Sequence, residues 1–247
     1  RLWHHVFGRG LVPTTDNFGR LADPPAHPEL LDHLARTFLQ NGWSTKQLLR
    51  ELLLSEAFRQ SSTPNPQAKE KDPQNAFLHH YPLRRLDAES VRDAILAVSG
   101  RLDATLYGPS IQPHRAEPVA YRRLFQGPLD GHGRRSVYLK ITRMQGPQFL
   151  EAFDFPPPLQ SRGNRDVTNV PSQALALLND PFVLQQSQFW AAQLEEHVPP
   201  AARLRHLFRK ALGRPPTPQE IDLYKALPDG PRIAHTLFNA KEFLYIP

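Results

Sequence analysis

The stretch PELLDHLARTFLQNGWSTKQLLRELLL, residues 28–54, decides the fold class. Its first half places apolar residues three and four positions apart, which is the spacing that gives a helix one apolar face. Gly42 lies where such a helix would end, and Ser44 with Gln47 forms a capping box that begins a second helix. The stretch therefore predicts two antiparallel helices joined by a short turn.

Similar signals recur along most of the chain. Asp87 precedes an apolar period that ends at Gly100, as expected for a capped helix. Further helices are predicted at 172–178, 181–197, 201–212, from 217 onward, and at 232–245. The connections between them are short, so neighbouring helices should pack antiparallel. The predicted fold class is mostly α: a multi-helix orthogonal or antiparallel bundle with long irregular loops and one short β element.

The predicted β element is the segment 135–143, where apolar and polar residues alternate. Val137, Leu139 and Ile141 would face one side of a half-buried strand. Its partner is not evident, although residues 119–126 are a candidate. Irregular, proline-containing stretches precede and follow this segment, and such long loops in a helical scaffold are where function tends to reside.

Length and composition predict a globular protein. The chain has 247 residues with 40% hydrophobic and 22% charged residues, and it contains no cysteine. No apolar run approaches the ~18 residues that a membrane span needs. We expect one helical domain over 1–247, a C-terminal fragment of a larger protein. A finer subdivision would give N-terminal helices at 1–100, a basic loop and strand segment at 101–170, and C-terminal helices at 171–247.

The net charge of +6 arises mainly in the middle third of the sequence. Residues 84–165 contain thirteen Lys and Arg against eight Asp and Glu, whereas both flanking thirds are nearly balanced. Guanidinium groups bind carboxylate, phosphate and sulfate well. The candidate anion- or partner-binding residues are Arg134, Arg135, Tyr138, Arg143, Arg162 and Arg165. The alternative is that these arginines hold loops in place by bonding backbone carbonyls and nearby carboxylates such as Asp154 or Asp166.

Motifs for catalysis and metal binding are absent from the sequence. There is no Gly-rich phosphate loop, nucleophile elbow or His-Glu-x-x-His pattern. Glu29 and His33 stand one helical turn apart but have no third ligand at a recognisable spacing, so no metal is predicted. Too few aromatic residues accompany the basic ones for nucleic-acid binding to be expected. A dispersed catalytic site would have to use distant carboxylates, namely Glu89, Asp93, Asp154 and Asp166.

An ordered series of short motifs carries a family resemblance over essentially the whole chain. In the first 100 residues the motifs are His4-His-Val-Phe-Gly-Arg-Gly-Leu-Val12, His27-Pro-Glu-Leu-Leu31, Gly42-Trp-Ser44 and Arg84-Arg-Leu-Asp-Ala-Glu89. The later motifs are Arg135-Ser-Val-Tyr138, Phe153-Asp-Phe-Pro156, Gln173-Ala-Leu-Ala-Leu-Leu-Asn179 and Glu242-Phe-Leu-Tyr245. The chain resembles the planctomycete C-terminal domain of unknown function, of the PSD-one type. That domain is found in large proteins which also contain a planctomycete-type cytochrome c module.

The resemblance implies a periplasmic or cell-envelope location and a haem c in an upstream module, with no cofactor in this chain. It implies no catalytic residues, and whether the chain is an enzyme stays undecided. The leading hypothesis is an accessory interaction domain that docks on the haem and middle domains of the same polypeptide. The alternatives are binding or processing of an anionic, sulfated polysaccharide, and an enzyme with the dispersed carboxylate site.

Overall fold

The two helices of residues 28–54 form as predicted. Helix α2 spans Pro28–Gln40 and helix α3 spans Thr45–Leu54. Pro28 occupies the first turn of α2, where its missing N–H is not needed. The hydroxyl of Ser44 accepts the backbone N–H of Gln47 at 3.3 Å, which caps α3. Leu34 of α2 packs with Leu48 and Leu52 of α3 in a common core.

The computed structural model describes residues 1–116, 124–143, 145–159, 162–225, 227 and 230–246. The chain divides into two compact units. Unit 1 comprises Arg1–Arg84 with two short later segments, and unit 2 comprises Arg85–Gln160 and Arg165–Tyr245. The boundary at Arg84 differs from the finer subdivision at residues 100 and 170, because the helix that ends near residue 98 packs into the core of unit 2.

Unit 1 also contains α1 (Leu2–Phe7) and the short α4 (Pro66–Lys71). Its core gathers Val6 and Phe7 of α1 against the hairpin of α2 and α3. The hydroxyl of Tyr81 donates a hydrogen bond of 2.8 Å to the carbonyl of Val6 and so fixes the last part of the unit on α1. Buried apolar contacts, and not propensity alone, stabilise helices as short as α1.

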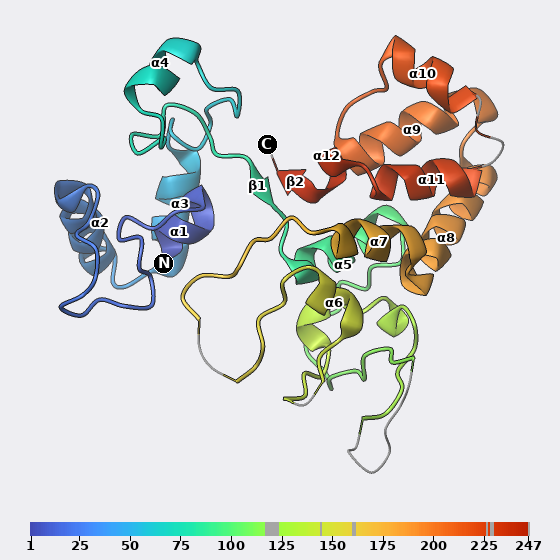
Figure 1. Cartoon of the computed structure of the whole chain (residues 1–247), viewed down its shortest axis with the longest axis horizontal. Coiled ribbons are helices and arrows are strands. Elements are labelled where there is room, and N and C mark those ends of the chain that lie inside the picture. Colours follow the sequence, from blue (N-terminus) through green and yellow to red (C-terminus); the bar gives the residue numbers. More distant parts are fainter. Residues whose placement is uncertain (117–123, 144, 160–161, 226, 228–229, 247) are drawn as a thin grey trace. The chain divides into compact units, whose positions relative to one another are not determined.

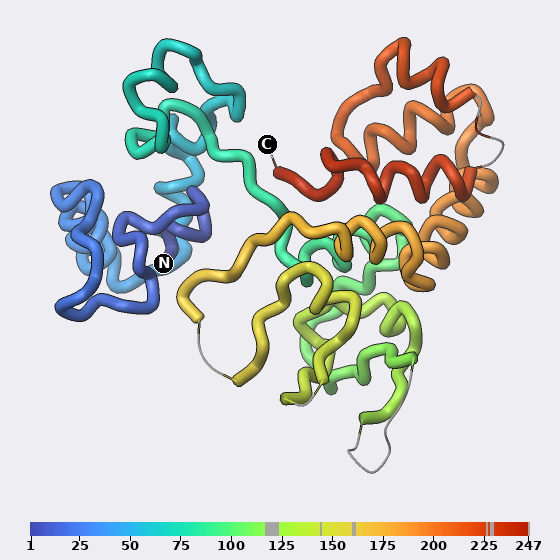
Figure 2. Tube along the Cα trace, in the orientation of Figure 1, coloured from blue at the N-terminus to red at the C-terminus, as the bar shows by residue number. Residues whose placement is uncertain are grey.

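Unit 2 contains most of the helical structure, as Figures 1 and 2 show. Its α-helices are α5 (Ala88–Val98), α6 (Gln148–Ala152), α7 (Pro171–Asn179), α8 (Pro181–His197), α9 (Pro200–Leu212), α10 (Pro218–Lys225), α11 (Gly230–Phe238) and α12 (Lys241–Leu244). Helices α8 and α11 form the most extensive pairing. The rings of Trp190 and Phe238, both buried, lie 5.2 Å apart across it.

The expected helix at 232–245 is divided in two. Asn239 follows α11, and its side-chain amide donates to the carbonyls of His235 and Leu177. A turn separates α11 from α12, and Phe243 packs on Phe238 with 5.3 Å between their ring centres. The strand β2 (Tyr245–Ile246) then pairs with β1 (Arg84–Arg85) in a two-stranded sheet.

The helix α5 ends where its sequence predicts. Gly100 follows it with a φ of 76°, a left-handed conformation that favours glycine. A Cβ atom at this position would also lie 2.3 Å from the Oε1 atom of Gln193, which is closer than atoms can approach. The buried face of α5 includes Val91, Ile95 and Leu96, all completely enclosed. The mostly α class is thus confirmed.

The predicted strand at 135–143 is wrong. Residues Ser136–Tyr138 form a short 3-10 helix, η3, which follows a similar turn, η2, at Gly131–Gly133. Of the three apolar residues expected to face inward, Leu139 is buried, but Val137 is 71% exposed and Ile141 is 37% exposed. Leu139 forms an isolated bridge with Ile111. Of the suggested partner segment 119–126, residues 119–123 lie outside the described residues.

The reason for this error is that, within the described parts of the chain, the segment meets another backbone only at Ile111, which bonds to Tyr138 and Lys140, while a side chain of α5 binds the backbone at Ser136. The carboxylate of Asp93 accepts both the backbone N–H and the hydroxyl of Ser136 at 2.7 Å. In a β-sheet, the backbone N–H of Ser136 would instead bond to a neighbouring strand. Among the described residues, no helix is both long and apolar enough to cross a membrane.

The tail of unit 2 contains an ion cluster of one arginine and two glutamates. Arg214 donates to both carboxylate oxygens of Glu220 at 2.8 Å and also contacts Glu242 at 2.7 Å. Glu220 further accepts the backbone N–H of Thr217, which completes the predicted capping box of α10. The guanidinium of Arg214 lowers the pKa of Glu220 to about 2, from an ordinary 4.5.

This pKa gives the first testable prediction. Because the folded-state pKa lies below the unfolded one, Glu220 stabilises the fold fully above pH 4.5, and this contribution is lost as the pH falls toward 2. Glu220→Gln retains the cap but loses the ion pair. It should lower the free energy of unfolding near pH 7 by about 1 kcal/mol, a value discounted for solvent screening.

The measurement is urea unfolding followed by circular dichroism across this pH range. The difference between wild type and Glu220→Gln should shrink steadily below pH 4.5. Glu70→Gln, an exposed glutamate on α4, is the control and should change stability little at any pH. A difference that persists undiminished at the acid end would contradict the assigned role of the cluster.

Candidate functional site

Arg134 and Tyr138, two residues of the predicted basic site, lie against each other in unit 2. The Cζ atom of Arg134 is 3.9 Å from the centre of the Tyr138 ring, a cation–π contact. Its Nη1 and Nη2 atoms donate to the carbonyls of Thr105 and Tyr107 at 2.9 and 2.6 Å. The guanidinium is only 12% exposed. Arg134 therefore holds the preceding loop in place.

Arg135 and Arg165 are each paired with carboxylates. Arg165 makes a two-pronged contact with Glu89, at 2.5 and 2.9 Å, and lies 3.5 Å from Asp87. The hydrogen bond to Glu89 raises the pKa of Arg165. Arg135 is half exposed, and its Nε atom is 3.9 Å from an oxygen of Asp93. Arg134, Arg135 and Arg165 thus each have partners within the protein.

Asp154 is the centre of a buried network that fixes the segment after α6. It accepts hydrogen bonds from Arg85 at 2.5 Å and from the backbone and hydroxyl of Thr168 at 2.9 and 2.7 Å. Burial acts to raise the pKa of Asp154, but the hydrogen bonds from Thr168 and Arg85 outweigh it, and the pKa is lowered. Its φ of 63° shows that this network also holds an unusual backbone conformation.

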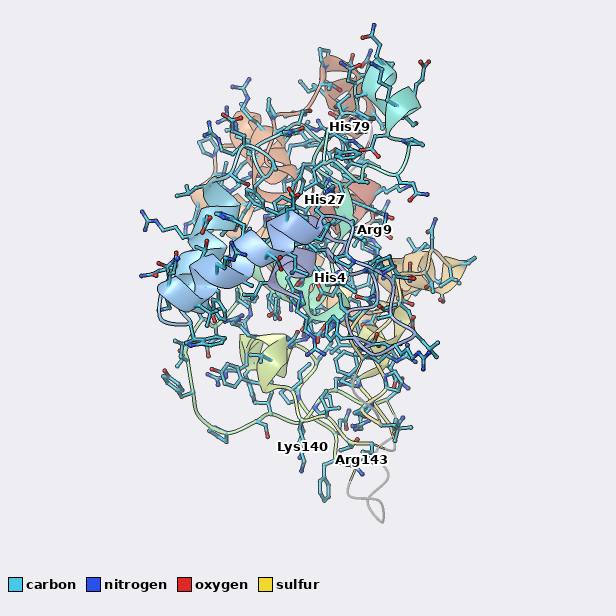
Figure 3. All side chains as sticks on the ribbon, turned by 90° about the vertical axis from the view of Figure 1, so that its left-hand side faces the viewer. His4, Arg9, His27, His79, Lys140 and Arg143 are labelled. Carbon is cyan, nitrogen blue, oxygen red and sulfur yellow. The ribbon has the colours of Figure 1, made fainter. Side chains whose placement is uncertain are left out.

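Lys140 and Arg143 differ from the other basic residues of the segment. Both are exposed, and neither has an ion-pair partner among the described residues. Figure 3 labels both on the irregular segment that carries them. Arg162 belongs to unit 1 and, like Asp166 of unit 2, has interactions with its surroundings. The basic residues Arg122 and Arg123 lie outside the described residues.

A pocket of about 60 Å³ opens between α5, α6 and the start of α8. All of its lining residues belong to unit 2. The walls are mostly apolar, and the charged or titratable side chains among them are Arg92, His114 and Asp180. An apolar concavity with a few converging polar groups is the usual form of a ligand site.

Arg92 projects from the buried side of α5, and its side chain is 6% exposed. Its Nη1 atom donates to the carbonyl of Arg134 and to the hydroxyl of Ser136, at 2.9 and 3.1 Å. Its Nη2 atom donates to the carbonyl of Asp130 at 2.7 Å. The guanidinium also lies over the ring of Phe182, 5.5 Å from its centre. Burial lowers the pKa of Arg92, but an arginine stays charged in proteins.

Asp180 caps the first turn of α8. Its Oδ1 atom accepts the backbone N–H of Phe182 at 2.9 Å. Burial raises the pKa of Asp180, and the cap and the nearby His114 only partly offset this effect. A ring nitrogen of His114 lies 3.4 Å from the carbonyl of Gly127. The pocket therefore combines the fixed cation of Arg92 with a carboxyl group, Asp180, whose pKa is raised.

The sequence interpretation did not select these three residues. Arg92 left a signal, because it stands four positions after Ala88 and three before Ile95, on the apolar face of its helix. Asp180 is visible as a helix cap before Pro181, but nothing local shows that it is buried. His114 lies in an irregular stretch and gives no signal.

The described residues contain no group of three His, Asp or Glu side chains that could hold a metal ion. His33, which the sequence pairs with Glu29, instead lies 3.9 Å from Glu51 on the surface of unit 1. Three of the four carboxylates proposed for a dispersed catalytic site, Glu89, Asp93 and Asp154, bond with arginines or loop backbone, as described above.

The chain belongs to the family described as PSD1, protein of unknown function (DUF1553). The model of that family matches residues 1–227. This match confirms the resemblance read from the sequence motifs. No curated protein and no solved structure matches the chain.

The raised pKa of Asp180 gives a prediction about stability. A carboxyl group whose pKa is raised on folding stabilises the fold below its unfolded pKa, and this stabilisation is lost as the pH rises through the folded value. Asp180→Asn retains a good helix cap and removes the titration. The stability of this variant relative to wild type should therefore increase as the pH rises from about 4 to about 8.

Urea unfolding at several pH values measures this trend. Asp222→Asn, at a carboxylate that is 75% exposed, serves as the control and should show no comparable rise. A constant difference between Asp180→Asn and wild type over the whole range would show that Asp180 is not perturbed by burial.

Proposed function

We propose that this chain is an accessory interaction domain, which docks on neighbouring domains of an exported protein through a strip of unit 2. The strip is residues 137–143, with Val137, Lys140, Ile141 and Arg143 as its exposed members. The observation that supports docking is the exposure of Lys140 and Arg143 without an internal ion pair among the described residues. The other arginines described in unit 2's basic segment have carboxylate or carbonyl partners.

The strip has the composition of a protein-binding surface. Val137 and Ile141, at 71% and 37% exposure, provide apolar area, and the two cations stand beside them in the sequence. Interfaces typically bury an apolar centre and keep charges near the rim, where they select a partner of opposite sign. The proposed partner face is therefore acidic with apolar residues among its carboxylates.

The proposed partners are the haem-bearing and middle domains of the same polypeptide. Membership of the family supports this choice, as does the resemblance of the sequence motifs to those of cytochrome c-associated proteins. The proposal includes a haem c in an upstream module, and a periplasmic or cell-envelope location for the whole protein. This chain would shape or cover a cleft on that module and would carry no cofactor itself.

Catalysis through dispersed carboxylates receives less support. Glu89 is held by Arg165, Asp93 by Ser136 and Asp154 by Arg85 and Thr168, so each is already used in holding a loop. Asp166 also interacts with its surroundings. Glu89, Asp93 and Asp154 would have to exchange these hydrogen bonds before acting as a general acid or base.

Calorimetric titration of this chain into the rest of the parent polypeptide tests the docking. The double variant Lys140→Glu/Arg143→Glu should weaken binding at low salt by about tenfold or more, because it reverses two charges at the contact. Lys46→Glu/Arg50→Glu makes the same change in net charge at two exposed positions of α3 and should change the affinity less than about twofold. Equal loss with both double variants would reduce the effect to net charge and contradict a specific strip.

A sulfated polysaccharide is the competing ligand for the same two cations. Chondroitin sulfate and dextran sulfate, added to the purified chain, would then raise its melting temperature, and Lys140→Glu/Arg143→Glu would abolish the increase. Under the docking proposal neither polymer shifts the melting temperature of wild type more than that of the double variant. A polymer effect without binding to the parent polypeptide would replace docking by polysaccharide binding.

A further inference from the structure

The pocket between α5, α6 and α8 shares only the buried Leu139 with the docking strip and has a chemistry of its own. Its volume of about 60 Å³ gives room for about four water-sized groups, at roughly 15 Å³ for each. A ligand that fills it is therefore the end of a small molecule, or a molecule of about four non-hydrogen atoms.

Arg92 offers that ligand an anchor. Its Nη1 atom already donates twice and its Nη2 atom donates once, but the Nε–H has no hydrogen-bond partner among the described residues. The Nε–H and the second hydrogen of Nη2 form one edge of the guanidinium fork. Two parallel donors on such an edge match the two oxygens of a carboxylate. The other three hydrogen bonds hold the group still, so a ligand would not have to order it.

The remaining walls suit the body of an organic acid. Leu129, Leu139, Phe149 and Phe182 surround the space with apolar surface. Among the residues that line it, Arg92, His114 and Asp180 are the charged or titratable ones. The guanidinium is already ion-paired with Asp93 at 3.5 Å, so its attraction for a ligand carboxylate rests on the two hydrogen-bond donors of its free edge. Burial raises the pKa of Asp180, so at a given pH this side chain repels a carboxylate less than an ordinary aspartate would.

We infer that this pocket binds the carboxylate end of a small organic acid, with the free edge of the Arg92 guanidinium as the anchor and the apolar walls around the carbon chain. No covalent step is involved. The site is independent of the proposed docking, because it uses none of the exposed side chains of the strip.

Nuclear magnetic resonance titration of the whole chain with sodium acetate and sodium propionate tests the inference. Backbone amides of residues 114–115, 129–131, 148–150, 180 and 182 should shift and saturate, with dissociation constants of about 1 mM. Propionamide has nearly the same shape without the charge and should bind at least about tenfold more weakly. Sodium chloride and sodium phosphate should not reproduce the shifts.

Two variants locate the binding. Arg92→Lys retains the charge but loses the fork, and it should weaken propionate binding by about tenfold or more. Because Arg92 also holds loops in place, a second variant is needed. Gln148→Trp, at an exposed position that lines the pocket, should block entry without changing the melting temperature. Gln67→Trp, exposed in the first turn of α4, is the matched control and should bind as wild type.

Several results would overturn the inference. Shifts that fail to saturate at concentrations of about 100 mM would show that there is no site. Equal binding of propionamide would show an apolar cavity without anion recognition, and equal shifts with chloride or phosphate would show an unspecific ion effect. Propionate binding that is unaffected by Gln148→Trp would place the acid elsewhere on the protein.

Discussion

The irregular half of unit 2 depends on one buried contact, in which Arg92 and Asp93 hydrogen-bond to residues 130–136. Arg92 donates to two backbone carbonyls and one hydroxyl of that loop, and Asp93 accepts an N–H and the same hydroxyl. A buried guanidinium is costly unless its hydrogens are satisfied, so the loop is held in one arrangement. The same contact closes one side of the pocket, and beyond it Val137, Lys140, Ile141 and Arg143 are exposed.

How far the fold could be predicted follows from where each element finds its hydrogen bonds. The backbone hydrogen bonds of helices such as α2, α3 and α8 form within each helix. Their caps and apolar spacing depend on residues close together in the sequence, so these helices were predicted closely. The segment 135–143 has the alternation of a strand, but its backbone partners are distant in the sequence. Ser136 bonds to the side chain of Asp93, and Tyr138 and Lys140 bond to the backbone of Ile111. Local periodicity contains no information about such partners.

The candidate site shows the same limit. Arginines gather in the middle third of the sequence. The alternative interpretation was that they bond to loop carbonyls and nearby carboxylates. In the structure, Arg134 bonds to a loop carbonyl and Arg165 bonds to a carboxylate. It could not show which cations stay exposed. It also missed the pocket, because Arg92, His114 and Asp180 come from three separate segments and meet only when α5 and α8 pack.

The pairing of α8 with α11 has a consequence for how the chain is made. The apolar face of α8 is covered by residues up to Phe243, beyond the family match that ends at 227. A ribosome delivers the sequence from its amino end, so α8 must wait, with Trp190 uncovered, while some 50 further residues are synthesised. During that interval the nascent chain exposes an apolar aromatic surface that favours association with other chains. A chaperone that binds this surface would prevent such association.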